Sequence, residues 1–445
     1  MRTNVAAEDT RPRAHEGGIA GRSTPLMELE RAIATTFLFE DSFYEGGASI
    51  AERIAKLCDE IPLEDVARLA IKARHEDKLR HVPLWLCRQL LRLHSGSIVG
   101  DTIGRVVSRP DEAAELVALY WKDKRTPLRA QLKRGIGIAF QKWDAYQLAK
   151  WDRGDKIKLR DVLFLCHPAP KDEAQAELWK QLVNKTLPAP LTWEVELSKG
   201  ADPKKTWEML LTEKRLGYMA LLQNLRNMTE AKVERSLIVD ALLAGAPKSW
   251  ALPFRFISAA KAAPGFAGEL SDAMVLAAKG EPLAGSTAVV VDVSGSMDSG
   301  MAGRSKLQRY EAAAGLAVLV REQCRDCRVF TFSYELKEVP NLRGLGLVTG
   351  ISQSQDHGAT YLARALDVLR ASIPAPERLV VVTDEQSSDG LGVPFAKRNY
   401  LINVAAYQNG LDLSGGWVRF SGWSERIVDF VRAHEALETD AGLAQ

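Results

Sequence analysis

The chain has 445 residues, of which 46% are hydrophobic and 26% charged, and its formal net charge is +2. This composition is typical of a soluble globular protein, and the length exceeds what one core usually organises, which predicts two domains. No apolar run approaches the roughly 20 residues that span a bilayer, and five cysteines, an odd number, argue against a disulfide framework. We therefore expect a cytoplasmic protein without membrane segments.

The first part of the chain reads as a leader followed by a helical array. Residues 1–24 mix charges with glycine and lack an apolar core segment, which predicts a disordered leader rather than a signal peptide. Beyond them, apolar residues recur at three- and four-residue spacing, for example in Ile50 to Cys58, Leu63 to Ala73, Leu84 to Leu93 and Val233 to Leu243. This periodicity predicts helices almost throughout, although no strict repeat length is visible.

Charge differs between the two parts of the chain. Residues 1–280 carry 43 Lys and Arg against 37 Asp and Glu, whereas residues 281–445 carry 16 against 20. The cations of the first part gather in short strings such as Lys72 to His75, Lys122 to Arg125 and Lys156 to Arg160. Such strings can follow a phosphate backbone, since anionic polymers draw much of their affinity from Lys and Arg. Solvated helix faces are the alternative.

A domain boundary is expected near Gly280 to Pro282, because helix-like and strand-like segments alternate after it, as a doubly wound sheet requires. After a first apolar strand that ends at Asp292, the pattern predicts a helix at Tyr310 to Glu322, a strand at Arg328 to Ser333, a helix at Tyr361 to Leu369, strands at Arg378 to Val382 and Tyr400 to Ala406, and a helix at Ser424 to Ala436.

Cys324 and Cys327 form a Cys-x-x-Cys between a predicted helix and a predicted strand. No second pair accompanies them, and none of the seven histidines is paired at metal-ligand spacing on a helix. We favour two structural thiols over a redox centre or half of a zinc site.

Oxygen ligands follow two of the predicted strands. The buried strand Ala288 to Val291 leads into Asp292, Ser294 and Ser296, and the strand Leu379 to Thr383 leads into Asp384. Thr360 adds a hydroxyl on a loop before a predicted helix. Ligands gather at the carboxyl ends of parallel strands, and carboxylates with hydroxyls suit a hard cation. The pattern predicts a divalent metal site, with Mg²⁺ as the ion.

This arrangement of residues resembles the metal-ion-dependent adhesion site of von Willebrand factor A domains, and all five of its positions are matched. The resemblance implies that Ser294, Ser296 and Thr360 contact the ion, while Asp292 and Asp384 contact it directly or hold its waters. It also implies a sixth position open to a carboxylate from a partner. A site that no longer binds metal is the alternative.

Several strings before the A domain resemble the TROVE domain of Ro autoantigen proteins, over residues 25 to about 270. They are Leu159 to Leu163 with His167 and Pro168, Leu191 to Glu194, Lys205 to Leu210, Met219 to Leu222, Asn224 to Met228 and Pro253 to Arg255. In that family an A domain follows directly, and this chain has the same order. We therefore expect a multidomain protein with a HEAT-like all-α array at 25–275, an α/β doubly wound A domain at 282–435 and a tail at 436–445.

The resemblance implies a monomeric ring, closed by the A domain, with RNA as its partner. In the family the outer surface holds small noncoding RNAs of the Y type, and the hole accepts single-stranded 3′ ends of misfolded RNA. The implied role is non-catalytic RNA quality control or degradation with an exoribonuclease such as polynucleotide phosphorylase. The compact form resembles bacterial members of the family.

The stretch that matches the family's RNA-contacting segment is rich in Lys and Arg. Its candidate phosphate contacts are Lys133, Arg134, Lys142, Lys150, Arg153, Lys156, Lys158 and Arg160, with Arg74, Arg80 and His81 as a second basic patch. The aromatic side chains among them are better explained as core than as base-stacking platforms. One departure is Leu159, which stands where the animal proteins carry an RNA-contacting His.

Two other functions stay open at the level of sequence. In one, the A domain is a Mg²⁺-dependent protein-interaction module and the helices are a scaffold. In the other, Asp292, Asp384 and Glu385 form a hydrolytic metal centre for phosphodiesters, although no general base at suitable spacing supports it.

Overall fold

The computed structural model describes Glu16 and residues 24–35, 46–152, 156–249, 251–301, 306–405, 410–413, 415–422 and 427–443. The chain forms two compact units. The helical unit comprises residues 25–39 and 47–216, and the sheet unit comprises residues 217–445 with 1–24 and 40–46. Among the described residues, no helix is both long enough and apolar enough to cross a membrane. The predicted leader lies almost wholly outside the described residues.

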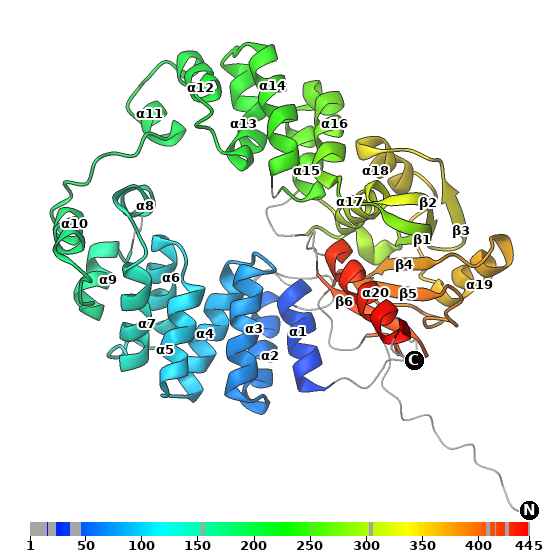
Figure 1. The fold of residues 1–445 in the computed structure, drawn as a ribbon, viewed down its shortest axis with the longest axis horizontal. Coiled ribbons are helices and arrows are strands. Elements are labelled where there is room, and N and C mark those ends of the chain that lie inside the picture. Colours follow the sequence, from blue (N-terminus) through cyan, green and yellow to red (C-terminus); the bar gives the residue numbers. More distant parts are fainter. Residues whose placement is uncertain are drawn as a thin grey trace, which may run out of the picture. The chain divides into compact units, whose positions relative to one another are not determined.

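The helical unit consists of short helices (Figure 1), and all of them except α11 have buried residues. They are α1 (Pro25–Thr35), α2 (Gly47–Glu60), α3 (Leu63–His75), α4 (His81–Leu93), α5 (Ser97–Val106), α6 (Pro110–Tyr120), α7 (Ala130–Phe140), α8 (Ala145–Trp151), α9 (Leu159–Cys166), α10 (Glu173–Asn184), α11 (Trp193–Ser198) and α12 (Pro203–Thr212). Helices α3, α4 and α5 contact one another, α4 contacts α6, and α5 contacts α7. This confirms the helical reading of the N-terminal periodicity.

The close contact between α5 and α7 depends on glycine residues in both helices. A Cβ on Gly135 of α7 would stand 2.5 Å from Ile103 Cβ of α5, and a Cβ on Gly104 would stand 2.7 Å from Ile138 Cγ2. The backbones of α5 and α7 therefore approach more closely than side chains with a Cβ would allow.

The sheet unit begins with helices rather than with the sheet. These are α13 (Tyr218–Glu230), α14 (Arg235–Gly245), η1 (Ala246–Lys248), α15 (Pro253–Ala262), η2 (Pro264–Phe266) and α16 (Ala267–Ala278). Both α15 and α16 pack on α17 (Arg309–Glu322), and α16 also contacts α18 (Gly344–Ser352). The last helices before the predicted boundary near Gly280 therefore belong to the same compact unit as the sheet.

In the described residues the sheet has six strands in the order β3-β2-β1-β4-β5-β6. The strands are β1 (Leu283–Asp292), β2 (Cys324–Phe332), β3 (Leu336–Val339), β4 (Arg378–Thr383), β5 (Arg398–Asn403) and β6 (Trp417–Ser421). Only the pairing of β2 with β3 is antiparallel. The strand order reverses between β1 and β4, which is where doubly wound sheets bind ligands.

Helices cover both faces of this sheet (Figure 1). On one face α19 (Leu362–Ser372) buries Leu366 and Leu369 against Val290 and Val381. On the other face lies α17, which contacts β1, β2 and β4 and is buried along most of its length. Burial on both faces explains why β1 and β4 read as continuous apolar runs rather than as alternating patterns.

The doubly wound fold that the alternating pattern predicts is confirmed, with shifts of up to seven residues at the ends of its elements. The predicted strand at Arg328 to Ser333 begins earlier, at Cys324, and the predicted strand at Tyr400 to Ala406 ends earlier, at Asn403. The last helix, α20 (Ile427–Leu443), runs past the expected end at Ala436. The predicted domain bounds and the closure of a ring stay predictions.

Candidate metal centre and nucleic-acid interface

The carboxyl ends of β1 and β4 bring four of the five predicted metal residues into one hydrogen-bonded group. Ser294 Oγ lies 3.2 Å from Ser296 Oγ, and Ser296 Oγ donates to Asp384 Oδ2 at 2.6 Å. Asp292 Oδ1 accepts from the Ser294 backbone N–H at 2.9 Å. All four side chains are buried.

Thr360 reaches the same edge through its loop. The Gly358 carbonyl accepts from the Gly295 N–H at 2.9 Å, which ties the loop to the Asp-x-Ser-x-Ser turn. The Thr360 carbonyl accepts from Ser387 Oγ at 3.1 Å and from the Ser388 N–H at 3.0 Å, which ties it to the segment after β4. The loop that carries Thr360 is therefore the third segment at this edge, as the sequence pattern requires.

The electrostatics of this edge suit a cation. Burial, followed by the charge of Asp384, raises the pKa of Asp292 to about 7, although hydrogen bonds from Ser294 and Thr383 oppose the shift. Two buried carboxyl groups that repel each other are a costly arrangement, which a divalent ion between them would relieve. Hydroxyl and carboxylate oxygens are also the donors that Mg²⁺ prefers. The donor set therefore fits the predicted ion, and metal binding itself stays a prediction.

Two residues of this edge were not anticipated from the sequence. Thr383 Oγ1 donates to Asp292 Oδ2 at 2.7 Å and accepts from the Glu385 backbone N–H at 3.1 Å. Ser333, after β2, donates to the Ala359 carbonyl at 2.9 Å and so holds the Thr360 loop. Both residues stand at the end of a strand-like run in the sequence, and this position is the signal that could have identified them.

Glu385 does not join this group. It follows Asp384 with φ of +60°, and its carboxylate accepts from Arg419 Nη2 at 2.7 Å and from the Leu411 N–H at 3.0 Å. The side chain therefore faces β6 rather than the edge that holds Asp292. This removes the third carboxylate from the hydrolytic centre that the sequence left open.

The predicted basic residues of the helical unit fall into two groups, and the first is engaged within the fold. Arg74 Nη2 lies 2.7 Å from Glu112 Oε1, and its other nitrogens donate to the carbonyls of Val106 and Leu79. Arg80 pairs with Asp111 at 2.7 Å and with Glu115. These contacts tie the α3–α4 turn to α6 and favour a structural role for both arginines.

Three further candidates have partners of their own. Lys142 Nζ donates to the Gly104 carbonyl, and burial lowers the pKa of the Lys142 ammonium. Arg134 pairs with Asp101 at 2.7 Å on the surface. His81 lies 3.6 Å from Glu115, and burial lowers the pKa of its imidazole.

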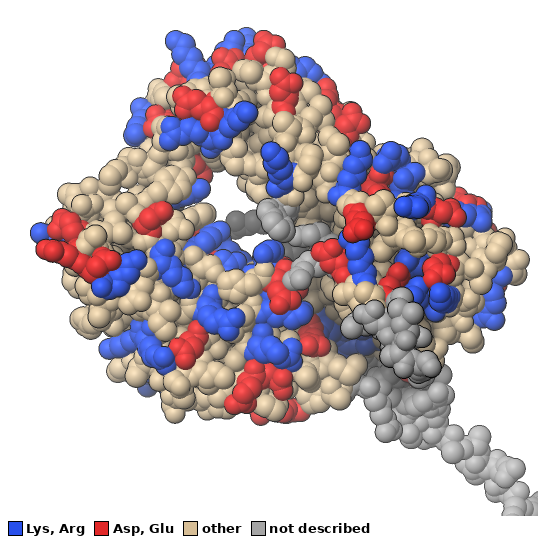
Figure 2. Space-filling model, in the orientation of Figure 1, with Lys and Arg blue, Asp and Glu red and all other residues tan. Residues whose placement is uncertain are grey.

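The second group comprises Lys133 on α7 and the candidates on and between α8 and α9. Lys156 is exposed, Lys133, Lys150, Lys158 and Arg160 are half-buried, and Arg153 lies outside the described residues. Arg160 has a loose contact with Asp161 at 3.6 Å, with 40% of the Arg160 side chain and 45% of the Asp161 side chain exposed. Figure 2 shows Lys and Arg side chains over the helical unit, with Asp and Glu between them.

The aromatic residues near this group were expected to be core, and the structure confirms this for one of them but not for all. Trp143 is core, since it is buried, packs edge-on against Phe140 at 4.9 Å and donates to the Ser108 carbonyl. Tyr146 and Phe164 are 47% and 54% exposed. Lys150 Nζ lies 5.5 Å from the Tyr146 ring. The exposed Tyr146 ring therefore stands beside the half-buried cation Lys150.

The departure at Leu159 and the family-like position of His167 both have structural explanations. Leu159 is buried as the first residue of α9, where it packs in the core of the helical unit. His167 ends the same helix in the left-handed region, with φ of +49°, and is exposed directly before Pro168. Its position as a helix cap favours a structural role for His167.

Comparison with known proteins gives a family match and a fold match. The family model for the TROVE domain matches residues 183–280. The crystal structure of the RO (RSR) protein of Deinococcus radiodurans is 17% identical and has a TM-score of 0.59, with 89% of this chain and 96% of that chain covered. A search of curated proteins finds no match. Residues 183–280 are therefore similar to the TROVE domain, and the chain has the fold of the Deinococcus radiodurans RO (RSR) protein over most of its length.

Proposed function

We propose that this protein binds RNA and has no catalytic activity of its own. The observation that carries the proposal is the TROVE match at residues 183–280 within a chain that has the Ro fold over most of its length. The exposed cations of the helical unit support it, because Lys and Arg contacts with phosphates supply affinity without reading a base sequence.

The α8–α9 basic cluster, defined as Lys150, Lys156, Lys158 and Arg160, is our candidate for the phosphate contacts. Its members are exposed or half-buried, and the Arg160 contact with Asp161 is long and open to solvent. Such surface pairs contribute little, so these cations can turn to a phosphate at small cost. Arg74 lacks this freedom because its guanidinium is held by Glu112 and two carbonyls.

Exposed rings beside the cluster favour single-stranded RNA. Tyr146 and Phe164 present aromatic surface, and bases without pairing partners stack on such rings with little sequence preference. The family resemblance extends this to small noncoding RNA of the Y type and to free 3′ ends. We propose that such an end is passed to an exoribonuclease such as polynucleotide phosphorylase, as part of RNA quality control.

The test compares two labelled stem-loop RNAs by fluorescence anisotropy, one blunt and one with a single-stranded 3′ tail. We expect the tailed RNA to bind more tightly, with an affinity that falls steeply between about 50 and 200 mM salt. Equal affinity for the two RNAs would contradict the preference for free ends. Absent or salt-insensitive binding of both would contradict RNA binding itself.

The second candidate function is a Mg²⁺-dependent protein-interaction module, favoured by the hydrogen-bonded group of Asp292, Ser294, Ser296 and Asp384. In this role Ser294, Ser296 and Thr360 would hold the ion, with Asp292 and Asp384 in contact with it or with its waters. The ion would supply an open position for a partner's carboxylate.

The variant Asp292→Ala separates the two functions. If RNA binding is the working activity of the helical unit, the variant keeps the wild-type RNA affinity. The metal edge, defined as Asp292, Ser294, Ser296, Thr360 and Asp384, is the working site in the second role. In that case the variant loses Mg²⁺-dependent capture of a partner, and RNA affinity is low in both the wild type and the variant. We expect neither protein to release labelled nucleotides from RNA in the presence of Mg²⁺, since Glu385 is held by Arg419.

A further inference from the structure

A histidine and an aspartate join two of the segments that meet at the metal edge. Asp298 lies two residues after Ser296, and His357 lies three residues before Thr360. His357 Nδ1 stands 2.5 Å from Asp298 Oδ1, and His357 Nε2 stands 3.2 Å from the Ser352 carbonyl oxygen. Carboxylate and carbonyl oxygens only accept hydrogen bonds, so the ring donates to both of them when it is protonated. The pair therefore links the Asp-x-Ser-x-Ser turn to the Thr360 loop through side chains.

The two members of this pair differ in how firmly the fold encloses them. The Tyr310 ring of α17 lies edge-on to the His357 ring, with the ring centroids 4.8 Å apart. Only 15% of the His357 side chain is exposed, against 43% of the Asp298 side chain. The imidazole is thus packed in place, whereas the carboxylate can be substituted at the surface.

The Thr360 loop is also fitted closely to the end of β2. The Gly358 N–H donates to Ser333 Oγ at 2.9 Å, and a Cβ on Gly358 would overlap the Tyr334 ring. Glycine therefore lets this ring lie directly against the loop. On the side of the turn, the hydrogen bond from the Gly295 N–H to the Gly358 carbonyl is joined by the contact between His357 and Asp298. The loop is held from both sides.

Mg²⁺ and Ca²⁺ make different demands on such a site. Mg²⁺ needs near-octahedral oxygen ligands at about 2.0–2.1 Å, whereas Ca²⁺ accepts ligands at about 2.3–2.6 Å in flexible arrangements. The candidate ligands Ser296 and Thr360 come from different segments, so the distance between their hydroxyls depends on how the loop is held against the turn. A fixed distance suits Mg²⁺, and a variable distance suits Ca²⁺.

We propose that the Asp298–His357 pair is a positioning clasp, which fixes the spacing of the ligands at the metal edge and so makes this edge selective for Mg²⁺ over Ca²⁺. In this role neither residue is a ligand, and each acts through the segment that carries one. The inference rests on the proposed metal binding at this edge and is independent of RNA binding.

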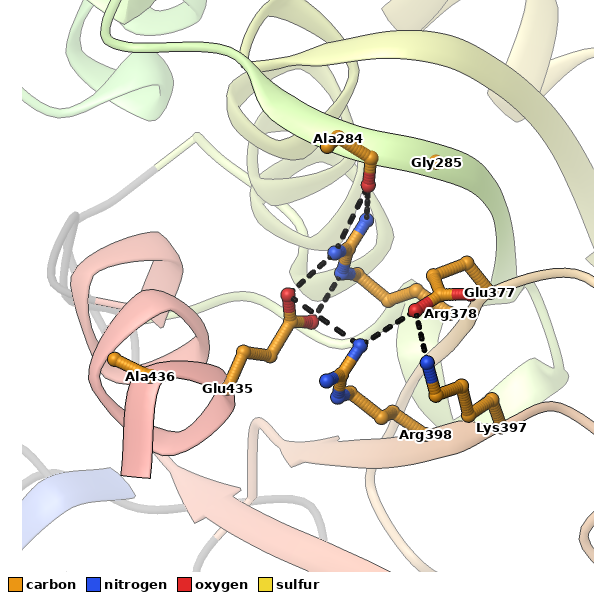
Figure 3. A pocket seen from close by; sticks show the side chains of 8 residues that line it. All are labelled: Ala284, Gly285, Glu377, Arg378, Lys397, Arg398, Glu435 and Ala436. Carbon is orange, nitrogen blue, oxygen red and sulfur yellow. Dashed lines mark hydrogen bonds and ion pairs between the residues drawn. The ribbon is translucent and has the colours of Figure 1, made fainter. Parts of the chain in front are cut away.

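Ion pairs at the opposite end of the sheet provide a control for stability. There Glu377 lies 2.7 Å from Arg398 Nη1 and 3.0 Å from Lys397 Nζ, beside the buried Arg378, which bonds to Glu435 at 2.6 Å (Figure 3). These side chains line a pocket of about 550 Å³ at the start of β4 and β5. The Glu377 side chain is 32% exposed, so Glu377→Gln breaks a comparable pair far from the metal edge.

The test titrates Mg²⁺ and Ca²⁺ into the metal-free full-length protein by isothermal titration calorimetry. We expect Asp298→Asn to weaken Mg²⁺ binding by about 10- to 100-fold, which is the usual cost of losing a residue that orients a metal ligand, and to weaken Ca²⁺ binding less. The preference for Mg²⁺ over Ca²⁺ should therefore fall. Asp356→Asn removes an exposed carboxylate next to His357 and should leave the preference unchanged. Glu377→Gln should leave it unchanged even where it lowers the thermal midpoint.

A double variant tests whether the two residues act as a pair. Because either single substitution already breaks the contact, Asp298→Asn/His357→Gln should lose no more Mg²⁺ affinity than the weaker-binding single variant. Losses that add would contradict a clasp. An unchanged ion preference in Asp298→Asn would overturn the proposal and leave the metal site in place. A wild type that binds neither ion would overturn the metal site and the clasp together.

Discussion

Arg74 and Lys156 carry the same charge but have different roles in the helical unit. Arg74 is 15% exposed and bonded to Glu112, a residue that is fully buried. Lys156 is exposed on the segment between α8 and α9. The partner of Arg74 stands 38 positions away in sequence, so the string Lys72 to His75 cannot distinguish the two roles. Only the fold shows which cations are available to a ligand.

Replacing Glu112 should destabilise the helical unit. Its carboxylate accepts from Arg74, from the Ser108 N–H at 2.9 Å and from the Arg109 N–H at 3.0 Å. Glu112→Gln leaves the half-buried Arg74 guanidinium without its counter-charge, so we expect a loss of about 3 kcal/mol. Thermal unfolding measures it, as a fall in the midpoint of ~6–12 °C for a unit of this size. The control Glu177→Gln removes an exposed pair with Lys180, and an equal fall there would contradict the account.

Asp292→Asn tests the metal edge. Removing one of two buried carboxylate charges should raise the thermal midpoint of the metal-free protein, because the repulsion from Asp384 is relieved. The same change should abolish the rise in midpoint that Mg²⁺ gives the wild type. Differential scanning calorimetry with and without Mg²⁺ measures both effects. In the control Asp367→Asn, on the exposed face of α19, the Mg²⁺ effect should persist.

Most of the predicted metal site could be derived from the sequence, because each candidate ligand ends a strand, follows one or lies on a loop at the same sheet edge. Asp292, Ser294, Ser296 and Asp384 meet as the pattern implies. The orientation of Glu385 could not be predicted, since it depends on Arg419, 34 residues later on β6.

At the scale of elements, the α5–α7 contact gives a matched pair of substitutions on one helix. Gly135→Ala would place a Cβ 2.5 Å from Ile103 Cβ and 2.7 Å from the Gly100 carbonyl, whereas a Cβ on Gly137 meets only Pro168 at 3.4 Å. We expect Gly135→Ala to lose about 1–3 kcal/mol through overpacking. Gly137→Ala should be neutral or gain up to about 1 kcal/mol from helix propensity. Thermal unfolding compares them, and equal midpoints would contradict the close contact.

Elements with a strong apolar period were predicted, and weakly patterned ones were missed. The helix α18 contains Gly344, Gly346 and Gly350, and forms because Leu347 and Ile351 are buried against its neighbours. The strand β3 has four residues at the sheet edge, where half of its pattern faces solvent. Tertiary packing decides both, and it leaves little trace in local sequence.

At the scale of the whole molecule, the segment that matches the TROVE model does not coincide with either compact unit. The TROVE match at 183–280 covers the end of the helical unit and the helices α13 to α16 of the sheet unit. The packing of α15 and α16 on α17 explains this, because it buries the last helices of the match against the A-domain fold. A fragment cut near Gly280 would expose that packed surface, so functional tests belong on the full chain.

The measurement that tests the central claim most directly is the salt dependence of RNA affinity for two triple variants. Lys156→Ala/Lys158→Ala/Arg160→Ala removes three members of the α8–α9 basic cluster, and Arg328→Ala/Lys337→Ala/Arg370→Ala removes three exposed charges from the sheet unit. Anisotropy titrations with the tailed RNA should show weaker binding for the first variant. The slope of log affinity against log salt should fall by ~2 for three lost single-strand contacts.

The second triple variant should keep the wild-type affinity and slope. That result, with the loss in the first variant, would place RNA on the helical unit. Equal affinity and slope in the first variant and the wild type would contradict the account.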